Sequence, residues 1–142
     1  RKPATLSRGC SESAAPKAGV VLQRSLILAA RLALGLCLVL TFLGALGPPG
    51  VGPGLFPWDK ANHFCAFFAI TAVAILALPR LGLIWIGVGA SALGAGIELA
   101  QALPFIGRDC DFWDWAADDA GIVAVLAVVV LAGFRQRISD LS

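Results

Sequence analysis

Four long apolar stretches, separated by short polar or glycine- and proline-rich segments, run through most of the sequence. They cover about residues 26–46, 59–78, 81–102 and 113–134. Each has close to the roughly 20 residues that a helix needs to cross the hydrocarbon core of a bilayer. Within that core a helix satisfies all of its own backbone hydrogen bonds. The pattern therefore predicts an all-α membrane protein with four transmembrane helices.

The segments between these stretches set the connections and the domain organisation. Residues 47–58 read GPPGVGPGLFPW, which cannot continue a helix. Residues 78–80 form a very short turn that makes the second and third helices antiparallel neighbours. We predict a basic tail over residues 1–25 and a single membrane domain over residues 26–142. The first apolar run exceeds the roughly 7–15 residues of a signal peptide's apolar region, so we expect it to span the membrane.

Composition agrees with this class of protein and excludes several others. Of the 142 residues, 58% are hydrophobic and only 14% are charged, against roughly 25% charged residues in soluble domains. So few charges do not cover a soluble surface of this size, and disordered chains are poorer in apolar residues. The net charge of +2 gives no basis for nucleic-acid binding, so we expect the bilayer to be the main partner.

The basic residues predict the orientation of the four helices. Nine of the eleven lysines and arginines lie at the N-terminus, at Arg31, in the turn at Arg80 or near the C-terminus. Only Lys60 and Arg108 fall at the opposite helix ends. Cytoplasmic segments are enriched in basic residues, so we predict that both termini lie in the cytoplasm.

The acidic residues gather at the opposite, outward-facing helix ends. Seven of the nine acids lie there, together with His63, the only histidine of the sequence. These acids are Asp59, Glu98, Asp109, Asp111, Asp114, Asp118 and Asp119. They come from three separate regions of the sequence, which the predicted topology brings to one end of the bundle.

Helical spacing places many of these polar residues on shared faces. Asp59 and His63 are four residues apart and lie on one side of the second helix. The third and fourth helices each carry a stripe of small and polar residues at intervals of three and four: Gly87, Ser91, Gly94, Glu98 and Gln101 on the third, and Asp111, Asp114, Asp118 and Gly121 on the fourth. Small residues allow close helix approach and polar residues hydrogen-bond between helices, so we expect these stripes to face the bundle interior.

Plain structural explanations stay open beside a functional one. Asp111 and Asp114 suit the N-terminal turn of a helix, and His63 suits a hydrogen-bonded helix end. Lys60 and Arg108 suit an interface where long side chains reach headgroups near an aromatic belt of Trp58, Trp113 and Trp115. Glu98 is harder to explain, because a carboxylate costs roughly 2.5 kcal/mol or more at the centre of a membrane helix. We expect it to join an ion-paired network with Lys60 and Arg108, which is either structural or a binding site.

At these residues the sequence resembles the VanZ-like family of small bacterial membrane proteins, over about residues 59–125. The family has Asp-Lys-x-x-His opening a helix, matched by Asp59, Lys60 and His63 in DKANHFCAFF. It has Glu-x-x-Gln ending the next helix, matched by Glu98 and Gln101 in GIELAQ. A loop Arg and a spaced Asp, Asn and Gly follow; the matches are Arg108, Asp114, Asp118 and Gly121, with Asp118 where the family often has Asn. The resemblance implies a multi-pass protein of the bacterial cytoplasmic (inner) membrane.

Three hypotheses for the function follow. The first is a non-enzymatic protein whose outward-facing polar pocket binds a lipid headgroup, a lipid-linked envelope precursor or a protein partner. The second is an accessory subunit of a larger membrane complex. The third is an outer-leaflet enzyme that uses clustered carboxylates and His63, with a divalent metal as one variant. We favour the first and expect no cofactor and no metal, since a single histidine without a compact ligand motif is a weak metal signal.

Overall fold

A computed structural model describes residues 18–48, 55–106 and 108–140, and it confirms the predicted all-α class. Four helices make up this part of the chain: α1 (Ala18–Leu46), α2 (Asp59–Ala77), α3 (Leu83–Gln101) and α4 (Phe112–Ser139). All four are long and apolar enough to cross a membrane. Four basic residues of the predicted N-terminal tail, Arg1, Lys2, Arg8 and Lys17, lie outside the described residues.

Two helices are longer than the hydropathy pattern predicted. Helix α1 begins at Ala18 rather than near residue 26, and α4 ends at Ser139 rather than near residue 134. Residues 18–25 of the predicted tail therefore belong to α1. Polar residues such as Gln23 and Arg24 are good helix formers, so the hydrogen-bonded helix continues where the hydropathy falls. Hydropathy marks a change of solvent and not the end of a helix.

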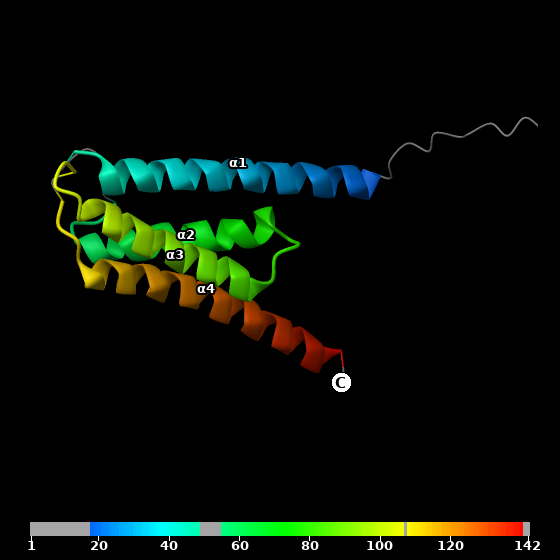
Figure 1. The fold of residues 1–142 in the computed structure, drawn as a ribbon. Coiled ribbons are helices and arrows are strands. Elements are labelled where there is room, and N and C mark those ends of the chain that lie inside the picture. Colours follow the sequence, from blue (N-terminus) through cyan, green and yellow to red (C-terminus); the bar gives the residue numbers. More distant parts are fainter. Residues whose placement is uncertain (1–17, 49–54, 107, 141–142) are drawn as a thin grey trace, which may run out of the picture.

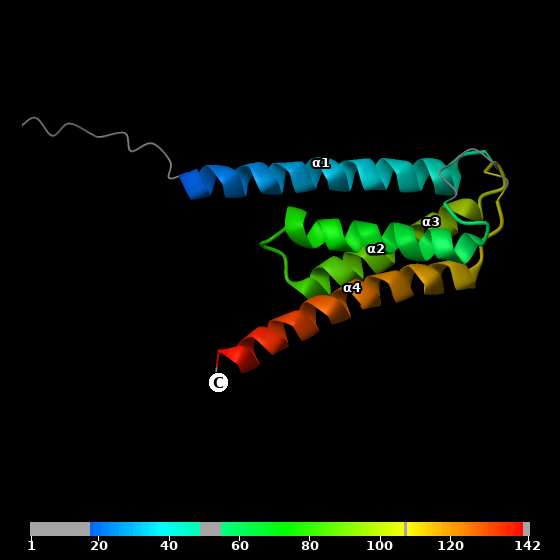
Figure 2. The same ribbon diagram turned by 180° about the vertical axis from the view of Figure 1, so that it is seen from behind.

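The helices form an antiparallel bundle with α2 and α3 in the middle (Figure 1). Helix α1 packs on α2 and α3 from one side, and α4 packs on the same two helices from the other. Within the described residues α1 and α4 have no direct packing contact. Seen from behind, the same three layers are evident, and α4 diverges from α1 toward its C-terminal end (Figure 2).

One end of the bundle carries the C-terminal ends of α1 and α3 and the N-terminal ends of α2 and α4 (Figure 1). We call it the loop end, because residues 47–48, 55–58, 102–106 and 108–111 of the two connections lie there. The N-terminal end of α1 and the C-terminal end of α4 lie at the opposite end (Figure 1). There Arg31 of α1 donates a hydrogen bond from Nε to the carbonyl oxygen of Ala77, the last residue of α2, at 3.2 Å. This bond satisfies a carbonyl that has no partner within its own helix.

Two glycines bring the helices around the interior close together. A Cβ on Gly121 of α4 would collide with the carbonyl oxygen of Phe64 in α2 and would lie 3.0 Å from the backbone nitrogen of Phe68. A Cβ on Gly94 of α3 would lie 2.7 Å from Oδ2 of Asp118 in α4. Such small residues allow helix backbones to approach within a membrane. The predicted small and polar stripe of α3 is buried at Gly94, while Ser91 within it is half-buried.

The outer surface of the bundle is largely apolar. The buried core is small and centres on Phe67, Ala90, Ile97 and Ile122. In contrast, the most apolar stretch of α1 has no buried residue, and large side chains such as Leu32 are widely exposed. A soluble monomer rarely exposes apolar surface on this scale, whereas lipid tails cover it without cost.

Candidate functional site

The N-terminal part of α2 carries three polar side chains that lie beside α4. Trp58, the residue before the helix, is extended, and Asp59, Lys60 and His63 follow in DKANH. Lys60 Nζ donates hydrogen bonds to Asp111 Oδ2 at 2.7 Å and to Asp114 Oδ1 at 2.8 Å. One ammonium thus joins α2 to the beginning of α4 through two charge-assisted hydrogen bonds.

Asp111 caps the N-terminus of α4. Its Oδ1 accepts a hydrogen bond from the backbone N–H of Trp113 at 2.9 Å, as is typical of an aspartate cap. The hydrogen bond from Lys60, followed by that from Trp113, holds the pKa of the Asp111 carboxyl below its ordinary value. The backbone N–H of Asp111 donates to Glu98 Oε2 at 2.9 Å, so the last turn of α3 joins the same network. The structural explanation considered for Asp111 is therefore correct, and Asp111 also binds Lys60.

His63 contacts Asp118, which lies six residues after the first residue of α4. Its Nδ1 lies 3.0 Å from Asp118 Oδ1, and the Asp118 side chain is fully buried. A carboxylate accepts hydrogen bonds and does not donate them, so His63 Nδ1 is the donor when Asp118 is ionised. Gly94 of α3 makes room for the pair, because a Cβ at that position would lie 2.7 Å from Asp118 Oδ2.

The other ring nitrogen of His63 faces two carboxyl groups. Nε2 lies 4.0 Å from Asp59 Oδ2 and 3.9 Å from Asp114 Oδ2, both beyond hydrogen-bonding distance. Asp59 is widely exposed, with 69% of its side-chain surface accessible, whereas Asp114 retains only 10%. The three residues Asp59, His63 and Asp114 are therefore accessible to solvent on the side of Asp59 and buried on the side of Asp114.

We call the set of side chains so connected the polar cluster. It consists of Asp59, Lys60, His63, Glu98, Asp111, Asp114 and Asp118, all of which the sequence singled out. The acids outnumber the bases: five carboxyl groups share one ammonium and one imidazole. Two buried carboxyl oxygens, Glu98 Oε1 and Asp118 Oδ2, have no hydrogen-bond partner among the described residues. A buried carboxyl in this state is costly, so the cluster favours an additional cation.

The remaining three predicted site residues serve the packing of the bundle. Gln101 Nε2 donates to the carbonyl oxygen of Ala45 at 2.9 Å, and Arg108 Nε donates to that of Gly47 at 3.2 Å. Ala45 is in the last turn of α1 and Gly47 directly follows it, where carbonyls lack helical partners and a cation is favoured. Gly121 allows α2 and α4 to approach.

The ion pairs that we expected for Glu98 are wrong in detail. Lys60 pairs with Asp111 and Asp114, and Arg108 Nε donates to the carbonyl oxygen of Gly47, the residue that follows α1. Glu98 accepts from a backbone N–H instead. Sequence spacing placed these residues at one end of the bundle, but the rotation of each helix decided which pairs meet.

Sequence reasoning missed the structural roles of three residues on α2 and α4. Thr71 is fully buried, and its Oγ1 has no hydrogen-bond partner among the described residues. Its position, eight residues after His63, was a usable signal, because residues four and eight apart share a helix face. Trp115 was assigned to the aromatic belt but donates from Nε1 to the carbonyl oxygen of Ser91 at 3.2 Å. Asn62 binds the backbone N–H and carbonyl of Phe56, fixing the chain before α2.

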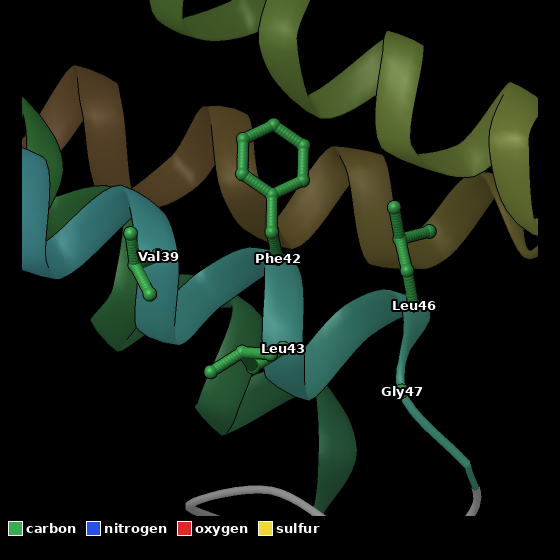
Figure 3. Close-up of a pocket in the computed structure, with 5 residues that line it drawn as sticks. All are labelled: Val39, Phe42, Leu43, Leu46 and Gly47. Atoms are coloured by element: carbon green, nitrogen blue, oxygen red, sulfur yellow. The ribbon is translucent and has the colours of Figure 1, made fainter.

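A shallow apolar hollow lies beside the loop end on α1 (Figure 3). Val39, Phe42, Leu43, Leu46 and Gly47 line it, and none of them belongs to the polar cluster. Its chemistry suits hydrocarbon and offers nothing to orient a polar ligand. This hollow therefore offers no polar recognition, in contrast to the polar cluster.

The fold and the apolar surface define a multi-pass, all-helical integral membrane protein. Comparison with known proteins adds no relative: no family model, no curated protein and no solved structure matches the chain. The assignment of function consequently depends on the geometry of the polar cluster.

Proposed function

We propose that this chain is a VanZ-like, non-enzymatic protein of the bacterial cytoplasmic membrane. In this proposal both termini lie in the cytoplasm and the polar cluster faces outward. The cluster binds the positively charged amine of a lipid headgroup or of a lipid-linked envelope precursor. The observation that carries the proposal is the charge balance of the cluster, in which carboxyl groups outnumber cations.

The contacts of the two basic residues favour an amine over a phosphate as the bound group. Lys60 Nζ is already engaged by Asp111 and Asp114, at 2.7 and 2.8 Å. Arg108 Nε is directed to the carbonyl oxygen of Gly47. An anionic phosphate would meet two bases that already serve other groups and five carboxyl groups that repel it, whereas an ammonium group meets carboxyl oxygens directly.

The exposure gradient across the cluster supports an approach from the loop end. Asp59 is mostly exposed, while Glu98 and Asp118 are buried behind it. An amine that reaches Asp59 first then meets progressively less hydrated carboxyl groups, where electrostatic attraction is stronger. The positive-inside distribution of lysine and arginine supports an outward-facing loop end.

Lipid retention in nanodiscs tests the proposal. The protein is reconstituted with equal amounts of phosphatidylethanolamine and phosphatidylglycerol, and native mass spectrometry measures which lipid remains bound after detergent release. We expect preferential retention of phosphatidylethanolamine, reduced several-fold by Asp59→Asn. Asp109→Asn is the matched control, because it removes an exposed carboxylate of the adjacent loop that is outside the cluster. Equal retention of both lipids, or equal effects of the two variants, would contradict the proposal.

A further inference from the structure

We propose that Asp59, His63 and Asp114 form a site for a divalent transition-metal ion. The sequence led us to expect no metal, because it shows one histidine and no compact ligand motif. The fold supplies what the sequence lacks by placing a second helix beside that histidine. This inference shares Asp59 and Asp114 with the proposed amine site, so a bound metal ion and an amine compete.

The geometry of the three ligand atoms is the first support. Asp59, His63 and Asp114 each offer one ligand atom, and these atoms lie within 4.8 Å of one another. Nε2 of His63 is 3.9–4.0 Å from the nearest oxygen of each aspartate. Ligands that lie about 2.1 Å from a zinc ion are roughly 3.4 Å apart in a tetrahedral site. Closing the group around an ion therefore requires each atom to move by only about 0.5 Å, which side-chain rotation supplies.

The hydrogen bonding of the three residues is the second, independent support. Asp114 is 93% buried as a residue, and Lys60 binds only its Oδ1. Among the described residues its Oδ2 has no hydrogen bond and faces His63 Nε2, which also has none. In the neutral imidazole that binds a metal, with the ring proton on Nδ1, the lone pair of Nε2 faces two carboxyl oxygens. One nitrogen and two oxygens that face one another in this way can coordinate a single cation.

The environment of His63 is the third support. A metal-binding histidine almost always donates its other ring N–H to a carboxylate or carbonyl, which fixes the ring and raises its basicity. Asp118 is in that position, fully buried and 3.0 Å from Nδ1. Asp118 thus acts as a positioning residue behind the ligand. This role also explains how a carboxyl is tolerated between α2, α3 and α4.

The ligand types indicate which ion is preferred. One imidazole nitrogen and two carboxylate oxygens suit Zn²⁺ or Mn²⁺, whereas Mg²⁺ and Ca²⁺ prefer oxygen ligands alone. Three protein ligands leave a fourth position of a zinc ion for water or another ligand. The exposed side of Asp59 is where that position would open.

Isothermal titration of the full chain with ZnCl₂ and with MgCl₂ tests the inference. The protein is purified without a histidine tag and held in nanodiscs of phosphatidylcholine, a lipid without a primary amine, and empty nanodiscs provide the baseline. We expect one Zn²⁺ per chain, bound at least tenfold more tightly than Mg²⁺. Asp59→Asn should weaken Zn²⁺ binding at least tenfold without loss of fold, because Asp59 is exposed. Asp118→Asn should weaken it 10- to 100-fold, the usual effect of removing such a partner. Asp109→Asn is the control and should leave binding unchanged.

Several outcomes would overturn the metal site: no stoichiometric Zn²⁺ binding, equal affinity for Zn²⁺ and Mg²⁺, or equal effects of Asp59→Asn and Asp109→Asn. Circular dichroism of each variant shows whether the fold is retained. The lipid assay separates this inference from the proposed function. Selective phosphatidylethanolamine retention without Zn²⁺ binding refutes only the metal site. Zn²⁺ binding without lipid selectivity supports the metal site and counts against the amine site.

Discussion

Replacing Gly121 with alanine tests whether close packing of α2 and α4 holds the polar cluster together. The added methyl would collide with the carbonyl oxygen of Phe64 and would lie 3.0 Å from the backbone nitrogen of Phe68. Both atoms belong to the backbone of α2, so no side-chain rotation relieves the contact. Reaching ordinary contact at 3.4 Å moves α2 away from α4 by about 0.4 Å or more at Phe68. Asp118, one turn before Gly121, would then be drawn away from His63.

The magnitude follows from two opposing effects. Overpacking of an interior costs about 1–3 kcal/mol, with the upper end applying where backbone has to move. Alanine is favoured over glycine within a helix by up to about 1 kcal/mol, which offsets part of the cost. We expect a net loss of about 1–2 kcal/mol in the free energy of unfolding. Titration with sodium dodecyl sulfate, followed by far-ultraviolet circular dichroism, measures this quantity in detergent.

Gly133→Ala on the same helix is the matched control. A Cβ at Gly133 has no neighbouring atom within 4 Å, so only the helix preference of alanine acts there. We expect Gly133→Ala to be unchanged or more stable by up to about 1 kcal/mol. If Gly121→Ala proved as stable as Gly133→Ala, α2 and α4 would not approach as closely as described, and the reasoning would be refuted.

Four further changes test other parts of the structure. Gln101→Ala should cost about 1 kcal/mol in the free energy of unfolding, because the carbonyl oxygen of Ala45 loses its hydrogen-bond donor. Amide hydrogen exchange near the end of α1 should become faster, and unchanged exchange would argue against this hydrogen bond. Thr71→Val should raise thermal stability, since the buried hydroxyl has no described partner and valine keeps its shape; a lower melting temperature would reveal a missed hydrogen bond. Lys60→Gln should destabilise more than Arg80→Gln, an exposed turn residue, in the same detergent titration, because Asp114 loses its ion pair; equal effects would rule that pair out. Asp111→Asn keeps a cap but loses the charge. The pKa of Asp111 is lowered in the folded state, so its stabilisation is present above the ordinary value of 3.8 and is lost as pH falls below it. The difference in melting temperature from the unchanged chain should therefore be full at pH 7 and shrink below pH 4; a difference independent of pH would contradict the Lys60–Asp111 interaction.

Local properties of the chain explain the correct sequence predictions. The four helices followed from apolar runs of membrane-spanning length, and the short turn at residues 78–80 fixed two of them as antiparallel neighbours. The shared face of Asp59 and His63 followed from a separation of four residues. Burial of Glu98, Gln101, Asp114 and Asp118 followed from the intervals of three and four on α3 and α4. The ends of α1 and α4 were missed because polar residues continue a helix as well as apolar ones do.

The partners within the cluster could not be predicted in the same way. The sequence placed Lys60 and Arg108 near Glu98, yet Lys60 binds two aspartates of α4 and Arg108 binds the end of α1. An error of one residue in helix register turns a side chain by about 100°, which is enough to exchange one partner for another. Only the packed structure fixes that rotation, through contacts such as Gly121 against Phe64.

By itself, the sequence determined the class of protein, its four helices and the end of the bundle where its acids gather, because hydropathy and helical period are properties of the chain alone. The tertiary structure decided that His63 is held by Asp118 and faces Asp59 and Asp114, while Gln101 binds Ala45 and Arg108 binds Gly47 at the end of α1. These pairings depend on the distances between the helices. Gly94 and Gly121 keep those distances short because they have no side chain to separate the helices. Because the paired residues lie up to 61 positions apart in the sequence, no local pattern predicts these pairings.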